Sequence, residues 1–180
     1  APLADPARTL RLRRPKTELR RLRASRSLRI PSQDGVGSTL FNPSRDEARR
    51  FLVDAWKKHR ALEPLSALEH MAAGIIALHP EYHAIVENPE RNLDRDWQPE
   101  SGDVNPFLHL SLHLAVGEQL SIDQPPGIRA EYERIRVVKG DEHAALHAVL
   151  ECLGEVLWKA QRHGLPPDAA LYVACVERQR

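Results

Sequence analysis

The sequence has little of what several common kinds of functional site require. Only two cysteines occur in 180 residues, too few for a disulfide framework or for the four thiolates of a structural zinc site. We expect Cys152 and Cys175 to be reduced and packed in the interior. The glycine-rich phosphate-binding loop, the dinucleotide-binding glycine pattern and the Gly-x-Ser-x-Gly nucleophile turn are also missing. Nucleotide binding and Ser or Cys hydrolysis therefore have little support.

Long hydrophobic runs are missing as well. No stretch approaches the roughly 18 to 20 apolar residues of a membrane span, and no apolar signal-peptide region follows the first residues. From this pattern we expect no membrane span and a cytoplasmic protein.

Charge is unevenly distributed along the chain, although the net charge is only +1. Residues 1–40 hold ten Lys or Arg against three acidic residues, whereas residues 41–180 are mildly acidic. Because residues 1–39 contain no aromatic side chain and few aliphatic ones, we expect a disordered basic tail. Such a tail could contact nucleic acid through charge alone. A targeting peptide or a misplaced translation start has the same composition, and a misplaced start would make the tail foreign to the native protein.

Helix signals dominate the remainder, which we interpret as a single helical domain over residues 40–180. Ser44 with Glu47 and Ser66 with Glu69 form capping boxes, and no alternating strand pattern competes with the helical one. The expected class is all-α, a compact bundle of about six helices. The expected helices are approximately 44–60, 105–120, 128–138, 141–163 and 168–177, together with one that starts at 66 and is interrupted by Pro80. A short new helix is expected to start at Pro80, and a long polar connection is expected at 88–103.

What the chain does have is histidine in a repeated spacing. Three pairs are separated by three residues each: His79 and His83, His109 and His113, His143 and His147. On a helix this spacing puts both imidazoles on one face, and imidazole is the commonest ligand of transition metals near neutral pH. Three such pairs among nine histidines exceed what random placement gives. The pattern predicts a metal site.

The pair His109 and His113 falls inside the apolar face of its predicted helix, because the polar Ser111 and Glu118 lie on the opposite side. A buried imidazole without a partner costs roughly 1 to 3 kcal/mol. Coordination of one cation would satisfy both rings. The alternative is that each ring bonds to a carbonyl or a carboxylate in the core.

For the other two pairs, the sequence does not fix whether the side chains face the core. His143, His147 and Glu151 follow one another at steps of four along the border of the apolar face of the longest predicted helix, where they could face a cavity or form a solvated polar edge. His79 and His83 flank Pro80, which interrupts the helix, so their separation does not follow from helical spacing. In this interpretation His79 is the N-cap of the short helix that starts at Pro80.

Several blocks resemble a known family. They are Phe41-Asn42-Pro43, the stretch from His79 to His83, the stretch from Asn105 to His113, the stretch from Glu118 to Ile128, and His147 with the stretch from Glu151 to Glu155. Over residues 40–180 these blocks resemble a mainly proteobacterial family, the domain of unknown function eighteen forty-one. The resemblance implies no activity and no catalytic residues.

Two functions follow from these patterns. The first is binding of one or two transition metals, Zn, Fe or Mn, because mixed imidazole and carboxylate ligands suit these ions. A dinuclear centre is one form of this hypothesis, with Glu151 or Glu155 moving protons if the centre is catalytic. The alternative is a non-enzymatic interaction protein with structural histidines, which contacts nucleic acid, if at all, through its basic tail. The candidate ligands are His79, His83, His109, His113, His143, His147 and Glu151.

Overall fold

The computed structural model describes residues 44–97 and 104–179. The predicted basic tail lies outside the described residues. The chain divides into two compact units, and every described helix belongs to the unit made of Gly35–Asp96 and Asn105–Arg180. Of the other unit, only Trp97 and Val104 are described.

The predicted all-α class is confirmed, since the described residues contain helices and no strand. They form eight α-helices rather than about six. Two of the eight are single-turn helices: α3, which follows Tyr82 where a short helix was expected to start at Pro80, and α4, which lies where we expected a polar connection. No helix within the described ranges is both long enough and apolar enough to cross a membrane. The helices are α1 (Arg45–Arg60), α2 (Ala67–Ala77), α3 (His83–Val86), α4 (Pro89–Asn92), α5 (Pro106–Ile122), α6 (Ile128–Lys139), α7 (Glu142–His163) and α8 (Ala169–Glu177), with a 3-10 turn, η2, at Pro80–Tyr82.

Local sequence explains where most of these helices begin and end. Both predicted capping boxes are present, at the start of α1 and of α2. The Asn105 side chain accepts a hydrogen bond from the backbone N–H of Leu108 at the start of α5, and Asp141 does the same for Ala144 at the start of α7. Gly164 ends α7 in the left-handed conformation, which glycine adopts without strain. These caps set the register of the two helices that carry most of the histidines.

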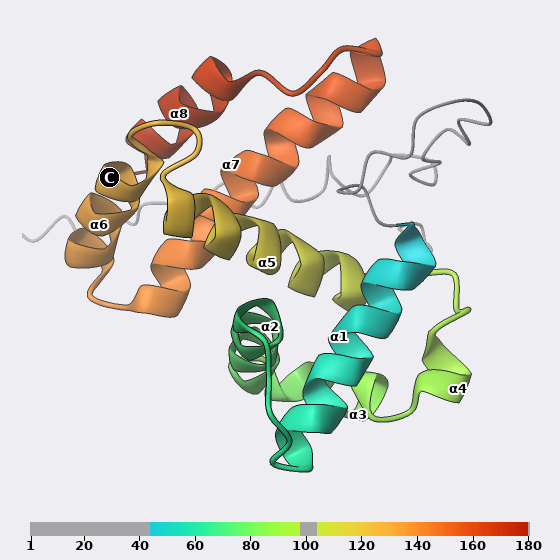
Figure 1. The fold of residues 1–180 in the computed structure, drawn as a ribbon. Helices are drawn as coiled ribbons and strands as arrows, with labels where there is room; N and C mark the ends of the chain where they lie inside the picture. The colour runs from blue at the N-terminus through green and yellow to red at the C-terminus, as the bar shows by residue number, and fades with distance from the viewer. Residues whose placement is uncertain (1–43, 98–103, 180) are drawn as a thin grey trace, which may run out of the picture. The chain divides into compact units, whose positions relative to one another are not determined.

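Helix α5 lies between two hydrophobic clusters and contributes to both (Figure 1). The amino-terminal cluster joins α1, α2 and α3 to the first half of α5, where Phe107 and Leu110 are buried. The carboxy-terminal cluster joins α6, α7 and α8 to the second half of α5, where Val116 is buried. The chain that leaves α2 therefore meets α5 from one side, and α7 meets it from the other.

The expectation of two reduced cysteines is wrong. Cys152 in α7 and Cys175 in α8 form a disulfide, with their Cα atoms 5.7 Å apart. Both side chains are buried in the carboxy-terminal cluster, because the chain reverses after Gly164 and packs α8 against α7. A count of cysteines carries no information on that reversal. Disulfides persist mainly in oxidising compartments, so this bond does not favour the expected cytoplasmic location.

Candidate metal centre

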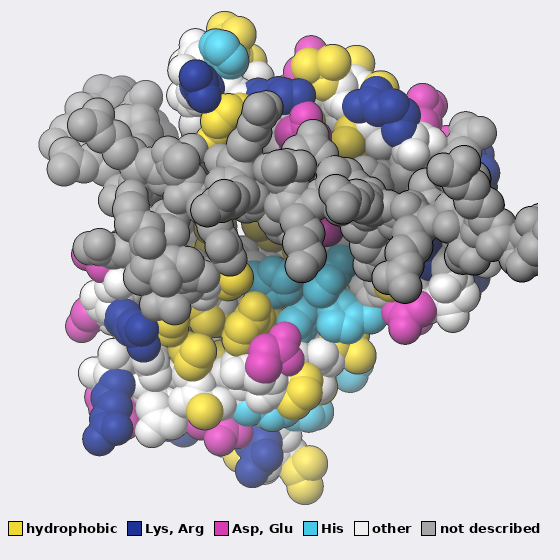
Figure 2. All heavy atoms as spheres, turned by 180° about the vertical axis from the view of Figure 1, so that it is seen from behind, with side chains coloured by type: hydrophobic (Ala, Val, Ile, Leu, Met, Phe, Trp, Pro, Cys, Tyr) yellow, Lys and Arg dark blue, Asp and Glu magenta, His cyan; other side chains and the backbone are white. Residues whose placement is uncertain are grey.

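Histidine side chains gather at one place on the molecular surface. Figure 2 shows the largest group of them as one patch beside hydrophobic side chains, with acidic side chains nearby and other histidines apart from it. Exposed hydrophobic residues alone are ordinary on a protein surface. A concentrated group of imidazoles is not, because each ring offers a nitrogen lone pair or an N–H group that needs a partner.

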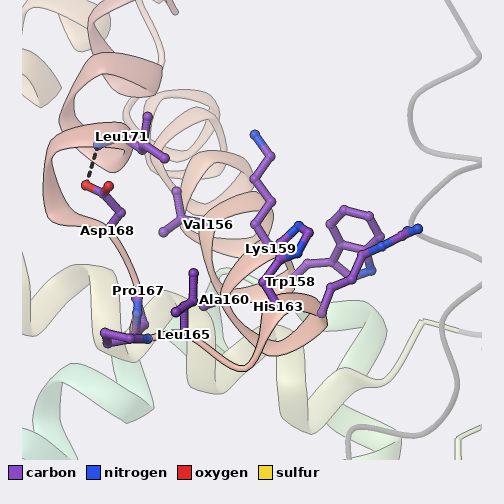
Figure 3. Close-up of a pocket in the computed structure, with 11 residues that line it drawn as sticks. Val156, Trp158, Lys159, Ala160, His163, Leu165, Pro167, Asp168 and Leu171 are labelled. Atoms are coloured by element: carbon purple, nitrogen blue, oxygen red, sulfur yellow. Dashed lines mark hydrogen bonds between the residues drawn. The ribbon is translucent and has the colours of Figure 1, made fainter.

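A pocket elsewhere in the structure does not involve these histidines. It lies between the end of α7 and the start of α8 and has a volume of about 850 Å³ (Figure 3). Apolar side chains such as Val156, Leu165 and Leu171 line it together with Lys159 and Arg162. None of the seven predicted ligands is among its lining residues, so it has no part in the predicted chemistry.

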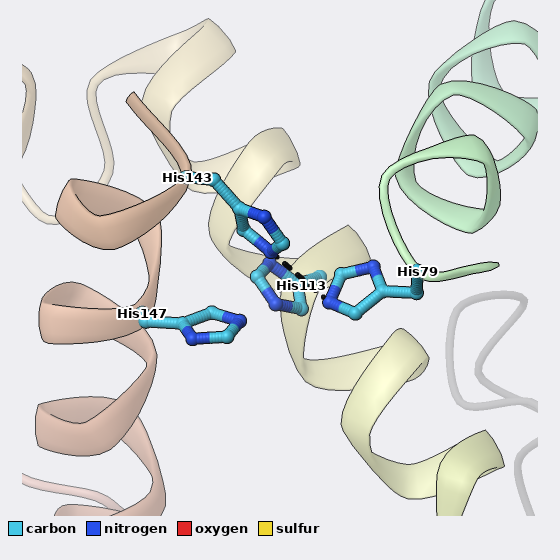
Figure 4. Close-up of side chains that lie close together, drawn as sticks. All are labelled: His79, His113, His143 and His147. Atoms are coloured by element: carbon cyan, nitrogen blue, oxygen red, sulfur yellow. Dashed lines mark hydrogen bonds between the residues drawn. The ribbon is translucent and has the colours of Figure 1, made fainter. Parts of the chain in front are cut away.

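Five of the histidines come together in the structure, and we call them the histidine cluster: His79, His109, His113, His143 and His147. They arise from three separate segments, namely the turn that follows α2, one face of α5 and the first two turns of α7. Figure 4 shows four of these rings pointing toward a common centre from the three segments. The i,i+4 spacing on α5 and on α7 places two rings from each helix on the side that faces the other segments.

The distances within the cluster are short. The Nε2 atom of His79 lies 3.1 Å from Nε2 of His109 and 3.1 Å from Nε2 of His143. For His79, His113, His143 and His147, one ligand atom from each residue lies within 4.8 Å of each of the others. The ring centroids of His109 and His113 are 4.8 Å apart. All five imidazoles therefore surround one small volume.

A metal ion fits this volume after a small contraction. Metal–imidazole bonds of about 2.0 to 2.1 Å allow two nitrogens on one ion to be at most about 4.2 Å apart. The 3.1 Å separations already satisfy this limit. A pair at the 4.8 Å limit would need to close by about half an ångström, which small rotations of the rings supply.

The hydrogen bonds of His79 leave one lone pair facing two neighbours. Its Nδ1 lies 2.8 Å from the backbone carbonyl oxygen of Ile75, so Nδ1 is the nitrogen that carries hydrogen and donates. Nε2 then has a single lone pair, directed into the cluster. The Nε2 atoms of His109 and His143 both approach it, and one lone pair cannot accept two well-aligned hydrogen bonds. A histidine that donates to a backbone carbonyl through its other nitrogen is typical of metal ligands.

Two further ring nitrogens are buried without any hydrogen-bond partner. They are Nε2 of His113 and Nε2 of His147. Unpartnered buried nitrogens are costly, at about 1 to 3 kcal/mol each, and are rare in folded proteins. Coordination to one cation would satisfy both of these atoms and the lone pair of His79 together.

Electrostatics keep three of these histidines in the neutral form that binds metals. Burial first, and the neighbouring imidazoles second, lower the pKa of His113 to about 2 and that of His109 to about 4. The pKa of His147 is also lowered, mainly by burial and then by His143. At neutral pH these rings are therefore unprotonated, as coordination requires.

The cluster has a buried side and a side nearer to solvent. His79 and His113 are only 1% and 2% exposed, whereas His109, His143 and His147 are partly exposed. The exposed carboxylate of Glu81 raises the pKa values of both His109 and His147, although less than burial lowers them. Asp141 acts on His147 in the same direction.

Two of the seven predicted ligands do not join the cluster. The Nε2 atom of His83 lies 2.9 Å from the carbonyl oxygen of Ile76, and its ring packs against Trp56. Glu151 is exposed and belongs to no ligand group among the described residues. Tyr82 was not expected from the sequence, yet its ring is stacked on His79 and packed edge-on against His109.

Fold and site together define a class: an all-α protein whose histidine cluster could hold a metal ion. The sequence model of the family described as "Domain of unknown function (DUF1841)" matches residues 44–178. The chain belongs to this family, as its sequence blocks predicted. The comparison with curated proteins found no match, and neither did the comparison with solved structures.

Proposed function

We propose that this protein binds one first-row transition metal ion through the histidine cluster. The observation that carries the proposal is the convergence of five imidazoles from three separate segments on one volume, with two buried Nε2 atoms that have no other partner. A core that used these histidines only for packing would need a hydrogen-bond partner for each of those nitrogens.

The donor set narrows the choice of metal. The ligand group found among the described residues contains histidines only, with no carboxylate and no thiolate. Imidazole suits Zn, Cu, Fe and Ni, whereas Mg, Ca and Mn prefer oxygen ligands. Of the ions considered from the sequence, Zn and Fe are therefore favoured over Mn.

The same geometry favours one ion over two. Dinuclear centres hold their ions about 3.5 to 4 Å apart and commonly use carboxylates to join them. The histidine cluster offers five nitrogens around a space in which the farthest of the four grouped ligand atoms are within 4.8 Å. Glu151, the carboxylate expected from the sequence, is exposed and outside that group. Five nitrogens in this space suffice for a single ion.

A structural role for the ion also has support. His79 follows a helix of the amino-terminal cluster, whereas His143 and His147 belong to a helix of the carboxy-terminal cluster. Both sides also pack against α5. An ion bound by all three segments would tie the two hydrophobic clusters together, and its binding free energy would add to the stability of the fold.

The test is elemental analysis of the full chain, purified without an affinity tag, before and after loading with Zn or Fe. We expect about one ion per chain, and at least a tenfold loss of affinity in His113→Ala and in His143→Ala. His143 is partly exposed, so its removal leaves less of a cavity than that of the buried His113. The exposed His70 in α2 provides the matched control, and His70→Ala should retain the ion.

The opposite result would favour the non-enzymatic interaction protein. In that case the wild-type chain retains no stoichiometric metal after desalting, and neither chelator nor added Zn or Fe changes its stability. Equal metal content in His70→Ala and His143→Ala, with both variants folded, would also exclude the histidine cluster as the metal-binding site.

A further inference from the structure

We propose that the metal ion in the histidine cluster also binds a small, singly charged anion on the partly exposed side of the cluster. This inference rests on the proposed function and extends it from metal binding to ligand binding. In this proposal the ion coordinates a ligand from solution and does not serve only to stabilise the fold.

The charge of the ligand set is the first argument. The ligand group found among the described residues consists of four histidines without a carboxylate or thiolate, and His109 adjoins it, with its Nε2 atom 3.1 Å from that of His79. Imidazole is a neutral ligand. A divalent ion held this way keeps its full charge of about two. In a site with two buried ligands and a low effective dielectric, that charge attracts an anion far more strongly than it would in water.

The distribution of burial is the second argument. His79 and His113 lie on the buried side, and His109, His143 and His147 are partly exposed. The histidine patch also reaches the surface in Figure 2. With His109 joining the four grouped histidines, the ion has five nitrogen ligands, one short of the six of an octahedral shell. Because protein side chains fill the inner side, the sixth position falls on the outer side.

The surroundings select for small size and single charge. The Tyr82 ring packs on both His79 and His109, and it limits the space beside them. The carboxylates of Glu81 and Asp141 act electrostatically on His109 and His147. Their negative charge opposes the approach of a phosphate or another multiply charged anion. Azide is a suitable probe, because it is small and singly charged. Its binding also changes the absorption spectrum of a transition metal ion.

The experiment loads the full chain with Co²⁺, whose visible absorption depends on the number and kind of its ligands, and titrates the complex with sodium azide. We expect a saturable spectral change that fits one azide per cobalt, with inorganic phosphate causing no comparable change. If the chain binds one cobalt and azide leaves the spectrum unaltered, the anion proposal is wrong and metal binding stands. If the chain binds no cobalt, both proposals fail.

Two variants make the result specific to the sixth position. His109→Ala removes one partly exposed ligand, so a second azide should bind per cobalt. His70→Ala changes an exposed histidine outside the cluster and should titrate like the wild type. If His109→Ala binds azide as the wild type does, His109 is not a ligand, and the five-nitrogen shell that leaves the sixth position open is disproved.

Discussion

The Nε2 atoms of His79 and His143 lie 3.1 Å apart, although the two residues are 64 positions apart in the sequence. His79 follows α2 and His143 lies in the first turn of α7, so this contact joins distant segments whose helices both pack against α5. Two unprotonated nitrogens at this distance repel each other unless a hydrogen atom or a cation lies between them. The stability of the fold should therefore depend on how this contact is satisfied.

A double-mutant cycle on His79→Ala and His143→Ala tests this dependence. With zinc at about 100 times its dissociation constant, bound metal adds about 2.7 kcal/mol to the free energy of unfolding. Each single variant should lose most of that amount, and the double variant should lose little more. The cycle then gives a strongly non-additive interaction energy in zinc and a much smaller one in chelator, measured by urea denaturation. Additive losses in zinc would show that the two residues do not share an ion.

The stability of the metal-free protein should fall as the pH is lowered from about 6.5 toward 4. The folded-state pKa values of His109 and His113 are about 4 and about 2, below the ordinary value of about 6.5 for the unfolded chain. In this window the unfolded chain binds protons that the folded chain does not, so folding loses stability as the pH falls. For the buried His113 the loss is at most about 1.4 kcal/mol per pH unit.

Urea denaturation in chelator at several pH values measures this profile. His113→Ala should flatten it, because the variant no longer has the imidazole whose pKa differs most between the two states. A profile in which the wild type and His113→Ala change in parallel between pH 6.5 and 4 would contradict the lowered pKa of His113.

Removal of the disulfide should destabilise the protein without removing the metal. Cys152 and Cys175 are separated by 23 positions, and a crosslink over such a loop stabilises a fold by about 3 to 4 kcal/mol in the chain-entropy description. Urea denaturation of a Cys152→Ala, Cys175→Ala double variant should show a loss of this order, with metal content unchanged. Thiol titration of the unfolded wild-type chain without reductant should find no free thiol. Two free thiols would restore the expectation of reduced cysteines.

The sequence predicted the helices well because their ends depend on local interactions. The capping boxes at Ser44 and Ser66 and the glycine at the end of α7 act within a few residues. The short helix expected from Pro80 corresponds to η2 and the single-turn helix α3. The single-turn helix α4 was taken for part of a polar connection, because an element of four residues carries almost no periodic signal.

The candidate site was predictable in part for the same reason. The spacing of four placed His109 with His113, and His143 with His147, correctly on their helices, since both pairs lie within regular α-helix. At His79 the backbone leaves the helical conformation, with φ −122° and ψ 66°. The spacing rule therefore fails there, and His83 faces Trp56 instead of the cluster. The convergence of the three histidine-bearing segments and the contact of Tyr82 with the histidine cluster both depend on tertiary packing. No local sequence pattern predicts such packing.

The most direct test of the metal centre is X-ray absorption spectroscopy at the edge of the metal, on the full chain loaded with one equivalent of zinc or iron and then desalted. We predict a first shell dominated by nitrogen at about 2.0 to 2.1 Å, with outer-shell scattering from four or five imidazole rings. A first shell dominated by oxygen or sulfur, with two imidazoles or fewer, or a protein that leaves the column without metal, would contradict the account.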